Sequence, residues 1–309
     1  MKIGYPCMNL SLECSSSRTF RLASYSEQRL VDTVEENLYC LRKILRFNQA
    51  NSLLFFRLTS GLVPFASHPV NTYPWQKHFS EQFQEIGGFI RESGMRISTH
   101  PGHFTIINST DEDIFDRSVA DLEYHADLLD LLGLGTDAKI QIHVGGVYNN
   151  KYESSERFIK RFLKLPLKVA RRLAIENDER SYTLADCLFL SKRIGIPVIM
   201  DYFHHELNNN GEKLADIFLL VKDTWKQKDG LPMIDYASQD PAKRFGSHAE
   251  TIDLDHFSAF LKVLGDQEVD IMLEIKDKER SALKVVEFRY VSPDSREDQK
   301  NAARESMLV

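Results

Sequence analysis

The chain has 309 residues, of which 42% are hydrophobic, and a formal net charge of −6. No apolar run approaches the ~20 residues that a membrane-spanning helix needs, and the acidic balance argues against a broad basic surface for nucleic acid. Four cysteines, Cys7, Cys14, Cys40 and Cys187, are scattered without a Cys-x-x-Cys pair, so we expect reduced thiols in a cytoplasmic protein with no targeting segment and no membrane partner.

Short apolar segments alternate with amphipathic segments along the chain. The apolar segments predict strands at 2–8, 53–58, 95–100, 138–143, 172–176, 196–201, 231–235 and 269–274. Apolar residues at helical spacing predict helices at 27–47, 75–93, 111–132, 152–169, 183–193, 213–226, 254–264 and 279–288. Strands that alternate with helices form parallel βα units, and eight such units close a TIM (β/α)8 barrel. We therefore predict an α/β fold with one barrel domain over 1–290 and a polar tail over 291–309.

Each predicted strand from the third onward ends in a residue type that binds metal ions. These residues are His100, His143, Glu176, Asp201, Asp235 and Glu274. The carboxyl ends of barrel strands meet on one face, where active sites lie, so we expect the six side chains to share a cavity. His204, three residues after Asp201, and His248, in the loop after 231–235, extend the set to eight.

A single His or Asp at a strand end is more often a helix cap or a loop residue, but six in succession are hard to explain in that way. Carboxylates buried together are costly without cations, and divalent ions remove that cost. Mixed His and carboxylate ligands favour zinc, manganese or iron over magnesium or calcium. Two or three such ions suit phosphoester hydrolysis. We assign Glu176, Asp201 and Glu274 to the catalytic centre, with Glu176 and Asp201 as the shared ligands.

Seven blocks of sequence, in order, resemble the ultraviolet-damage endonuclease family over 2–288. They are RLTSGLVPFASHP at 57–69, HPGHF at 100–104, HVGG at 143–146, IEND at 175–178, DYFHH at 201–205, SHA at 247–249 and EIKDK at 274–278. The resemblance implies a metal-dependent TIM-barrel enzyme that repairs double-stranded DNA. It would hydrolyse the phosphodiester immediately 5′ of cyclobutane pyrimidine dimers and 6-4 photoproducts, leaving a 3′-hydroxyl and a 5′-phosphate.

The resemblance also implies how the ligands are shared. One ion would be held by His100, His143 and Glu176, a second by Glu176, Asp201, Asp235 and Glu274, and a third by His204 with His248. Manganese is the expected ion, with zinc, magnesium and cobalt as alternatives. Two positions depart from the family pattern, because many members have His at position 235 and Lys at position 233, where this chain has Asp and Met. Both departures bear on the third ion.

Loops on the same face are the expected DNA interface. The resemblance places His103 and Phe104 at the lesion, instead of the Gln-Tyr or Gln-Phe pair of other members, and an unstacked damaged step is the easiest place for such a wedge to enter. Further DNA contacts are predicted for Tyr5, Asn9, Tyr148, Lys151 and Lys276. A core role for Tyr5 and a turn role for Asn9 are the alternatives.

Two other functions fit part of the pattern. A metal-dependent sugar isomerase or epimerase shares the barrel and the ring of ligands, and a lysine or second acid over a small closed pocket would favour it. A non-catalytic lesion-binding protein would keep the exposed wedge without turnover. We predict that the protein is a monomer.

Overall fold

The computed structural model describes residues 1–291 of the chain. Within them, eight parallel strands form a closed barrel in sequence order. The strands are β1 (Ile3–Pro6), β2 (Phe55–Leu58), β3 (Arg96–Thr99), β4 (Lys139–His143), β5 (Leu173–Glu176), β6 (Val198–Asp201), β7 (Met233–Tyr236) and β8 (Asp270–Leu273). The predicted TIM barrel is confirmed. The predicted tail lies outside the described residues, except for Val291, the last residue of the final helix.

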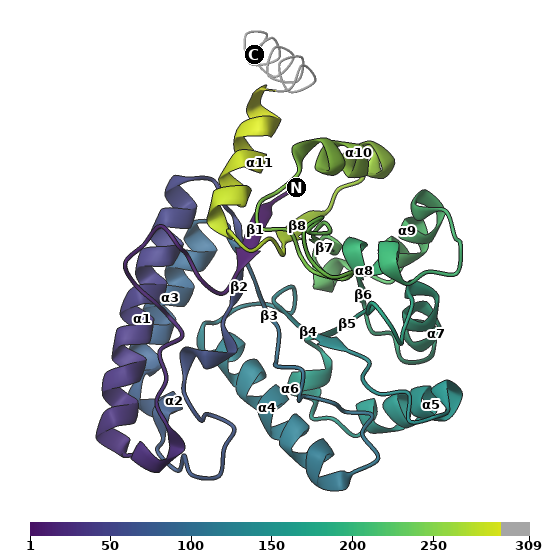
Figure 1. Ribbon diagram of the computed structural model, residues 1–309. Coiled ribbons are helices and arrows are strands. Elements are labelled where there is room, and N and C mark those ends of the chain that lie inside the picture. The colour runs from purple at the N-terminus through teal and green to yellow at the C-terminus, as the bar shows by residue number, and fades with distance from the viewer. Residues whose placement is uncertain (292–309) are drawn as a thin grey trace.

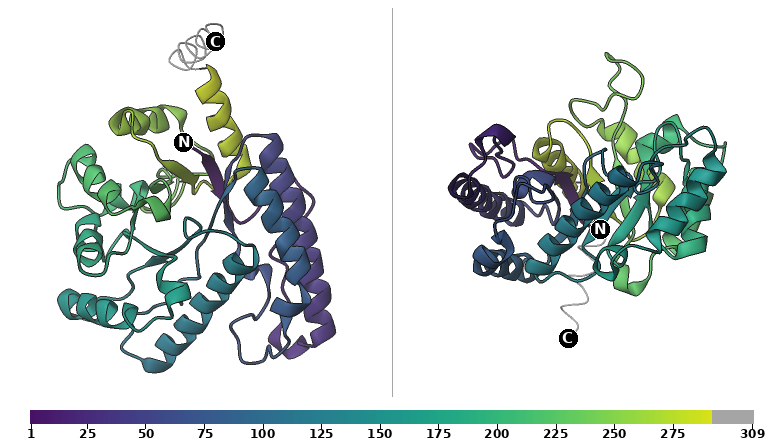
Figure 2. Two further views of the ribbon diagram at one scale, coloured as in Figure 1. Left: turned by 180° about the vertical axis from the view of Figure 1, so that it is seen from behind. Right: turned by 90° about the horizontal axis from the view of Figure 1, so that it is seen from below.

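The helices form a ring outside the strands, as Figures 1 and 2 show. They are α1 (Glu27–Ala50), α2 (Trp75–His78), α3 (Ser80–Glu92), α4 (Glu112–Leu131), α5 (Lys151–Phe162), α6 (Leu167–Ala170), α7 (Leu184–Ile194), α8 (Tyr202–Leu207), α9 (Leu214–Asp223), α10 (Leu254–Leu264) and α11 (Glu279–Val291). The predicted helix at 152–169 is two helices, because Pro166 begins a new one. None of the helices in residues 1–291 is both long and apolar enough to cross a membrane.

Side chains along each strand point alternately toward the helices and into the barrel interior. Side chains such as Ile175 and Val198 face outward and join the main core, whereas Ala174 and Ile199 face inward. The inward side chains form a separate apolar layer that fills the barrel: Phe55, Ala174, Ile199, Trp225, Met233 and Met272. This layer supports the polar side chains that come next along the same strands.

Buried ion pairs close the amino-terminal end of the barrel. Arg96 pairs with Asp270 at 2.9 Å, and Lys139 pairs with Asp229. Arg96, Lys139 and Asp270 are the first residues of their strands. These charged side chains pair with one another, and the candidate metal ligands gather at the opposite end.

The loop at 11–26 is tied to α1. The structure joins Cys14 and Cys40 in a disulfide, so the prediction of four reduced thiols is wrong for these two, while Cys7 and Cys187 are free. The Asn37 side chain, on α1, also bonds the backbone of Arg18 in both directions. The two cysteines meet because the loop runs along the helix, which their separation of 26 residues does not reveal.

Candidate functional site

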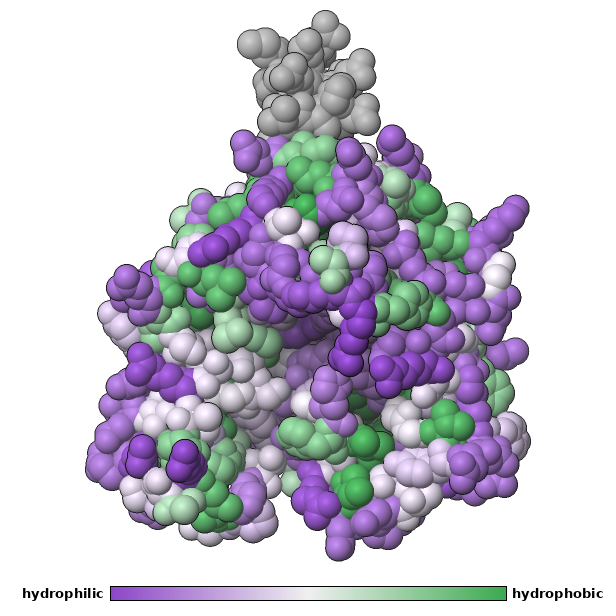
Figure 3. Space-filling model, viewed as in Figure 1, coloured by the Kyte–Doolittle hydropathy of each residue, from purple (hydrophilic) through white to green (hydrophobic). Residues whose placement is uncertain are grey.

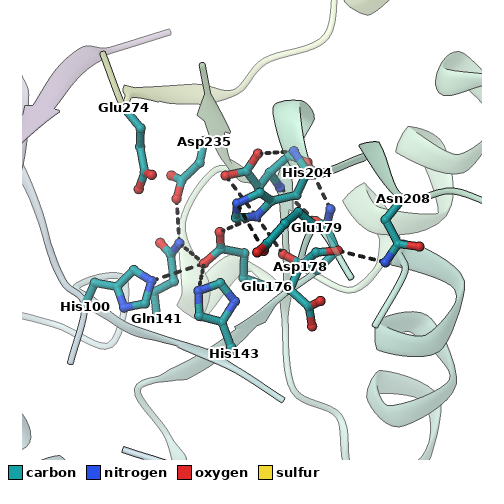
Figure 4. Close-up of polar contacts among 12 residues, drawn as sticks. His100, Gln141, His143, Glu176, Asp178, Glu179, His204, Asn208, Asp235 and Glu274 are labelled. Atoms are coloured by element: carbon teal, nitrogen blue, oxygen red, sulfur yellow. Dashed lines mark hydrogen bonds and ion pairs between the residues drawn. The ribbon is translucent and has the colours of Figure 1, made fainter. Parts of the chain in front are cut away.

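Potential metal ligands meet above the carboxyl ends of the strands (Figure 4). They form three groups: His100, His143 and Glu176; Glu176, Asp201 and His204; and Asp201, Asp235 and Glu274. Within each group the potential ligand atoms lie within 4.8 Å of one another. The parallel register causes this convergence, since His143 is the direct neighbour of Glu176 on β4 and β5, and Asp201 of Asp235 on β6 and β7. Seven of the eight predicted ligands are thus brought together.

Glu176 is the centre of the site. Its side chain is 1% exposed, and Gln141 Nε2 donates a hydrogen bond of 2.5 Å to its Oε2. His100 Nε2 and His143 Nε2 lie 3.2 and 3.7 Å from the same oxygen, and His204 Nδ1 lies 3.4 Å from Oε1. Burial would raise the pKa of Glu176, but the surrounding histidines hold it well below its usual value. Glu176 is therefore an ionised carboxylate with nitrogen donors on both of its oxygens.

Asp201 and His204 are positioned by α8, a short helix where the sequence predicted a loop. Asp201 ends β6 and caps α8, because its Oδ1 accepts the backbone N–H of His204 at 2.7 Å. The cap turns His204 back toward Glu176. Burial lowers the pKa of His204, but Asp201 and Glu176 outweigh it and raise that pKa to about 11. The carboxylates thus hold a proton on His204 where a metal ion would otherwise supply positive charge.

Arg57 is a site residue that sequence reasoning missed. It projects from β2 into the barrel, where Nη2 donates to both oxygens of Asp235 at 2.8 and 2.7 Å and to Gln141 Oε1 at 2.9 Å, and Nη1 pairs with Glu274. Burial raises the pKa of Asp235 to about 7, against the lowering effect of Arg57. For Glu274, Arg57 outweighs burial and the pKa is about 2.

The donor set fits divalent metal ions. His143 Nδ1 and Asp201 Oδ2 are buried atoms that make no hydrogen bond. Each belongs to a residue of the first two groups, and a buried polar atom left without a partner is costly. Imidazole and carboxylate together suit zinc, manganese or iron.

His248 lies beside these groups but belongs to none of them. Its Nδ1 is 2.7 Å from the backbone oxygen of Glu274, and its ring centre is 6.4 Å from that of His204. This contact fixes the ring and leaves Nε2 on the opposite side of it.

The histidines border a cavity of about 410 Å³. Its described lining includes His100, His103, His143, His204 and His248. In the view of Figure 1, the space-filling picture shows a hollow in the middle of the molecule, with many hydrophilic residues around it (Figure 3). The four candidate histidine ligands are therefore reachable from solvent.

The predicted DNA contacts differ in their surroundings. His103 stacks on His143 with ring centres 5.9 Å apart, and Phe104 beside it is 70% exposed. Tyr148 is 40% exposed on the loop after β4. The two lysines are engaged in ion pairs, Lys151 with Asp186 at 2.8 Å and Lys276 with Glu250 at 3.1 Å.

Tyr5 and Asn9 are not brought to the cavity. Tyr5 is fully buried, and its hydroxyl donates to Asn48 Oδ1 at 2.6 Å and accepts from Asn9 Nδ2 at 2.8 Å. Asn9 is 4% exposed, and its Oδ1 accepts the backbone N–H groups of the next turn. Their burial favours the core and turn roles, and we do not carry the two residues into the DNA interface.

A second exposed aromatic, Phe245, was missed. It is 78% exposed on the loop after β7, next to Gly246, which lines the cavity as His248 does. Gln239 fastens this loop, because its side chain accepts from Gly246 N and donates to the backbone oxygen of Arg244. The available signal was a phenylalanine within a polar loop on the catalytic face.

The comparison with known proteins shows which family the chain belongs to. The model of the family described as UV-endonuclease UvdE matches residues 1–298. The chain belongs to the UvdE family of UV endonucleases. The resemblance predicted from the sequence blocks is confirmed, and the UvdE family is a family of endonucleases acting on UV-damaged DNA.

Relatives of this UvdE-family chain match it over nearly its whole length. The UV DNA damage endonuclease of Clostridium perfringens is 39% identical over 288 residues, which cover 93% of this chain and 70% of that protein. The enzyme of the same name from Bacillus thuringiensis is 33% identical, with 93% of this chain and 94% of that one covered. The crystal structure of SacUVDE has a TM-score of 0.90 at 46% identity and covers 94% of this chain and 98% of its own.

More distant structures share the fold alone. Endonuclease IV from Thermus thermophilus gives a TM-score of 0.56 at 17% identity, covering 94% of this chain and 98% of its own. A D-psicose 3-epimerase solved with D-fructose gives 0.57 at 12% identity with the same coverage. The barrel therefore does not by itself separate DNA cleavage from sugar chemistry.

Proposed function

We propose that this chain is a metal-dependent repair endonuclease that cuts the phosphodiester immediately 5′ of cyclobutane pyrimidine dimers and 6-4 photoproducts, leaving a 3′-hydroxyl and a 5′-phosphate. The observation that carries the metal dependence is the position of Glu176. This one buried carboxylate belongs to two donor groups below a cavity that opens to the surface. A carboxylate shared between two groups is what a pair of ions on one phosphate requires.

Two of the three donor groups share Glu176 and form neighbouring positions. His100, His143 and Glu176 would hold one ion, and Glu176, Asp201 and His204, with His248 beside them, a second. When bound, divalent ions, with manganese our choice, supply Lewis-acid stabilisation of the phosphate and a water of lowered pKa.

The chain's own polar groups fix these ligands. Gln141 holds the Glu176 carboxylate, the α8 cap holds Asp201, and Glu274 borders the same space. Ligands held in this way keep the reacting phosphate in line without reorganisation.

DNA would be bound by local contacts around the cavity. Phe104 and Phe245 are exposed aromatics on two different loops beside it, and His103 lines its wall. Aromatic side chains can enter an unstacked step, and a photoproduct makes unstacking cheaper. Tyr148, Lys151 and Lys276 are the candidate phosphate contacts, so binding should weaken with salt.

The epimerase alternative has less support. It calls for a lysine or second acid over a small closed pocket; the described cavity lining contains Asp178 and Glu179 but no lysine, and the cavity opens to the surface. Phe104 and Phe245 are exposed outside the cavity lining, where they suit an extended substrate better than a small enclosed sugar.

Nicking of supercoiled plasmid tests the proposal. Protein stripped with chelator should convert UV-irradiated plasmid to the open circle only after manganese is added, and should leave unirradiated plasmid closed. Equal cutting of both plasmids would refute lesion specificity, and cutting in chelator would refute metal dependence. Tight lesion binding without cutting would support the non-catalytic alternative.

A further inference from the structure

Arg57 lies in one of the three donor groups. Asp201, Asp235 and Glu274 offer ligand atoms within 4.8 Å of one another, as the other two groups do. In this group, however, the Arg57 guanidinium contacts two of the three carboxylates. We infer that Arg57 is the permanent cation of the Asp235 and Glu274 corner, and that the centre takes two metal ions rather than three; this inference rests on the metal dependence proposed above.

The contacts of Asp235 leave little room for an ion. Arg57 Nη2 donates to both of its oxygens, and Gln141 Nε2 donates to Oδ2 at 2.5 Å. A carboxylate offers about four lone-pair positions, so three donors nearly fill it. Asp201 belongs both to this group and to the group of Glu176 and His204, and its Oδ2 makes no hydrogen bond. That oxygen lies 3.3 Å from His204 Nδ1, so it is available to an ion held with Glu176 and His204.

Arg57 cannot easily move away. Its side chain is 3% exposed, and Asp235 is fully buried. An arginine stays protonated even when buried. Swinging the guanidinium out would leave the buried Asp235 carboxylate without its charged partner, which is strongly destabilising.

The charges of the site give the same number of ions. When all four are ionised, as carboxylates that hold cations must be, Glu176, Asp201, Asp235 and Glu274 carry four negative charges, and Arg57 returns one. Two divalent ions would leave the site with a single positive charge, which matches one phosphodiester. A third would leave three positive charges in a buried site, which is costly to assemble.

Positions 233 and 235 lie on the same face of β7. Met233 joins the apolar layer inside the barrel. Arg57 holds both oxygens of Asp235, two residues later. This corner therefore consists of an internal ion pair above an apolar side chain.

Manganese stoichiometry tests the inference. Metal-free protein is titrated calorimetrically, and bound manganese is counted after equilibrium dialysis. We expect two ions for the wild type, two for Asp235→Asn, and three for Arg57→Gln, in which the freed carboxylates can take an ion. Arg57→Lys keeps the charge and should stay at two. Arg18→Gln, which removes an exposed arginine paired with Glu36, is the matched control and should also bind two.

The inference is overturned if the wild type binds three ions, or if folded Arg57→Gln still binds two. If Arg57→Gln does not fold, the wild type and Asp235→Asn decide the matter alone. Nicking of irradiated plasmid by the same samples reports on the proposed function separately. Two bound ions without incision would refute that function and support the assignment of Arg57.

Discussion

Replacing Glu176 with glutamine should disrupt metal binding while the protein remains folded. Glu176 belongs to two donor groups, so Glu176→Gln should weaken both metal positions and abolish incision. Glutamine has nearly the same volume and can still accept the hydrogen bond from Gln141. We therefore expect a folded protein that responds little to manganese.

The expected changes in stability follow from the distances between the charges. Two like charges 4.8 Å apart repel by about 3.5 kcal/mol at an effective dielectric constant of about 20. Removing the Glu176 charge relieves such repulsion from Asp201 but loses its attraction to the surrounding histidines, which hold its pKa low, so the variant in chelator should be somewhat less stable than the wild type. Manganese at about 100 times its Kd stabilises each occupied position by about 2.7 kcal/mol. For a chain of this size that is roughly 5 °C in Tm per position.

Differential scanning calorimetry with and without manganese is the assay. The wild-type Tm should rise by about 10 °C, and the Tm of Glu176→Gln by less than about 3 °C. Glu206→Gln is the matched control, since Glu206 lies on α8 beyond His204 and pairs with His256 instead of joining a donor group; it should behave as the wild type. An equal manganese shift in Glu176→Gln and the wild type would refute the shared-ligand role.

Three further expectations follow. Phe104→Ala should lower the preference for damaged over intact duplex about tenfold, because base stacking is worth about 1–3 kcal/mol, whereas Phe189→Ala, on α7, should not change that preference in competition binding. Burial lowers the pKa of His125 from 6.5 to about 4, so stability should be full above pH 6.5 and fall by about 3 kcal/mol as the pH drops to 4. Urea melts of His125→Gln should not show that fall in stability between pH 6.5 and pH 4. The disulfide of Cys14 and Cys40 closes a loop with a sequence separation of 26 residues. Cys14→Ser should therefore lower the free energy of unfolding by about 3 kcal/mol, and a urea melt equal to that of the wild type would contradict this.

The barrel and the convergence of ligands could be predicted from the sequence. Eight apolar segments alternating with helices fix a parallel barrel, and that geometry places His100 and Glu274, far apart in sequence, at the same end. The sequence pattern is informative here because each predicted strand from the third onward ends in a residue type that binds metal ions. Local capping also positions the ligands, since Asp201 ends β6 and is the N-cap of α8.

Arg57 and Tyr5 show what the pattern could not provide. An arginine in a strand is usually solvated, and only contacts across the barrel, to residues 178 and 217 positions away, make Arg57 part of the site. Tyr5 sits on a strand that points at the cavity, yet Asn48 on α1 holds its hydroxyl in the core. Such roles depend on tertiary partners that the sequence spacing does not encode.

Mapping the cut at a single lesion tests the central claim most directly. A duplex with one cyclobutane dimer, labelled at either end of the damaged strand, is incubated with the wild-type protein and manganese. We expect one break immediately 5′ of the dimer, with a 3′-hydroxyl that a polymerase extends and a 5′-phosphate on the lesion-bearing fragment. Breaks elsewhere, other termini or an intact strand would contradict the account.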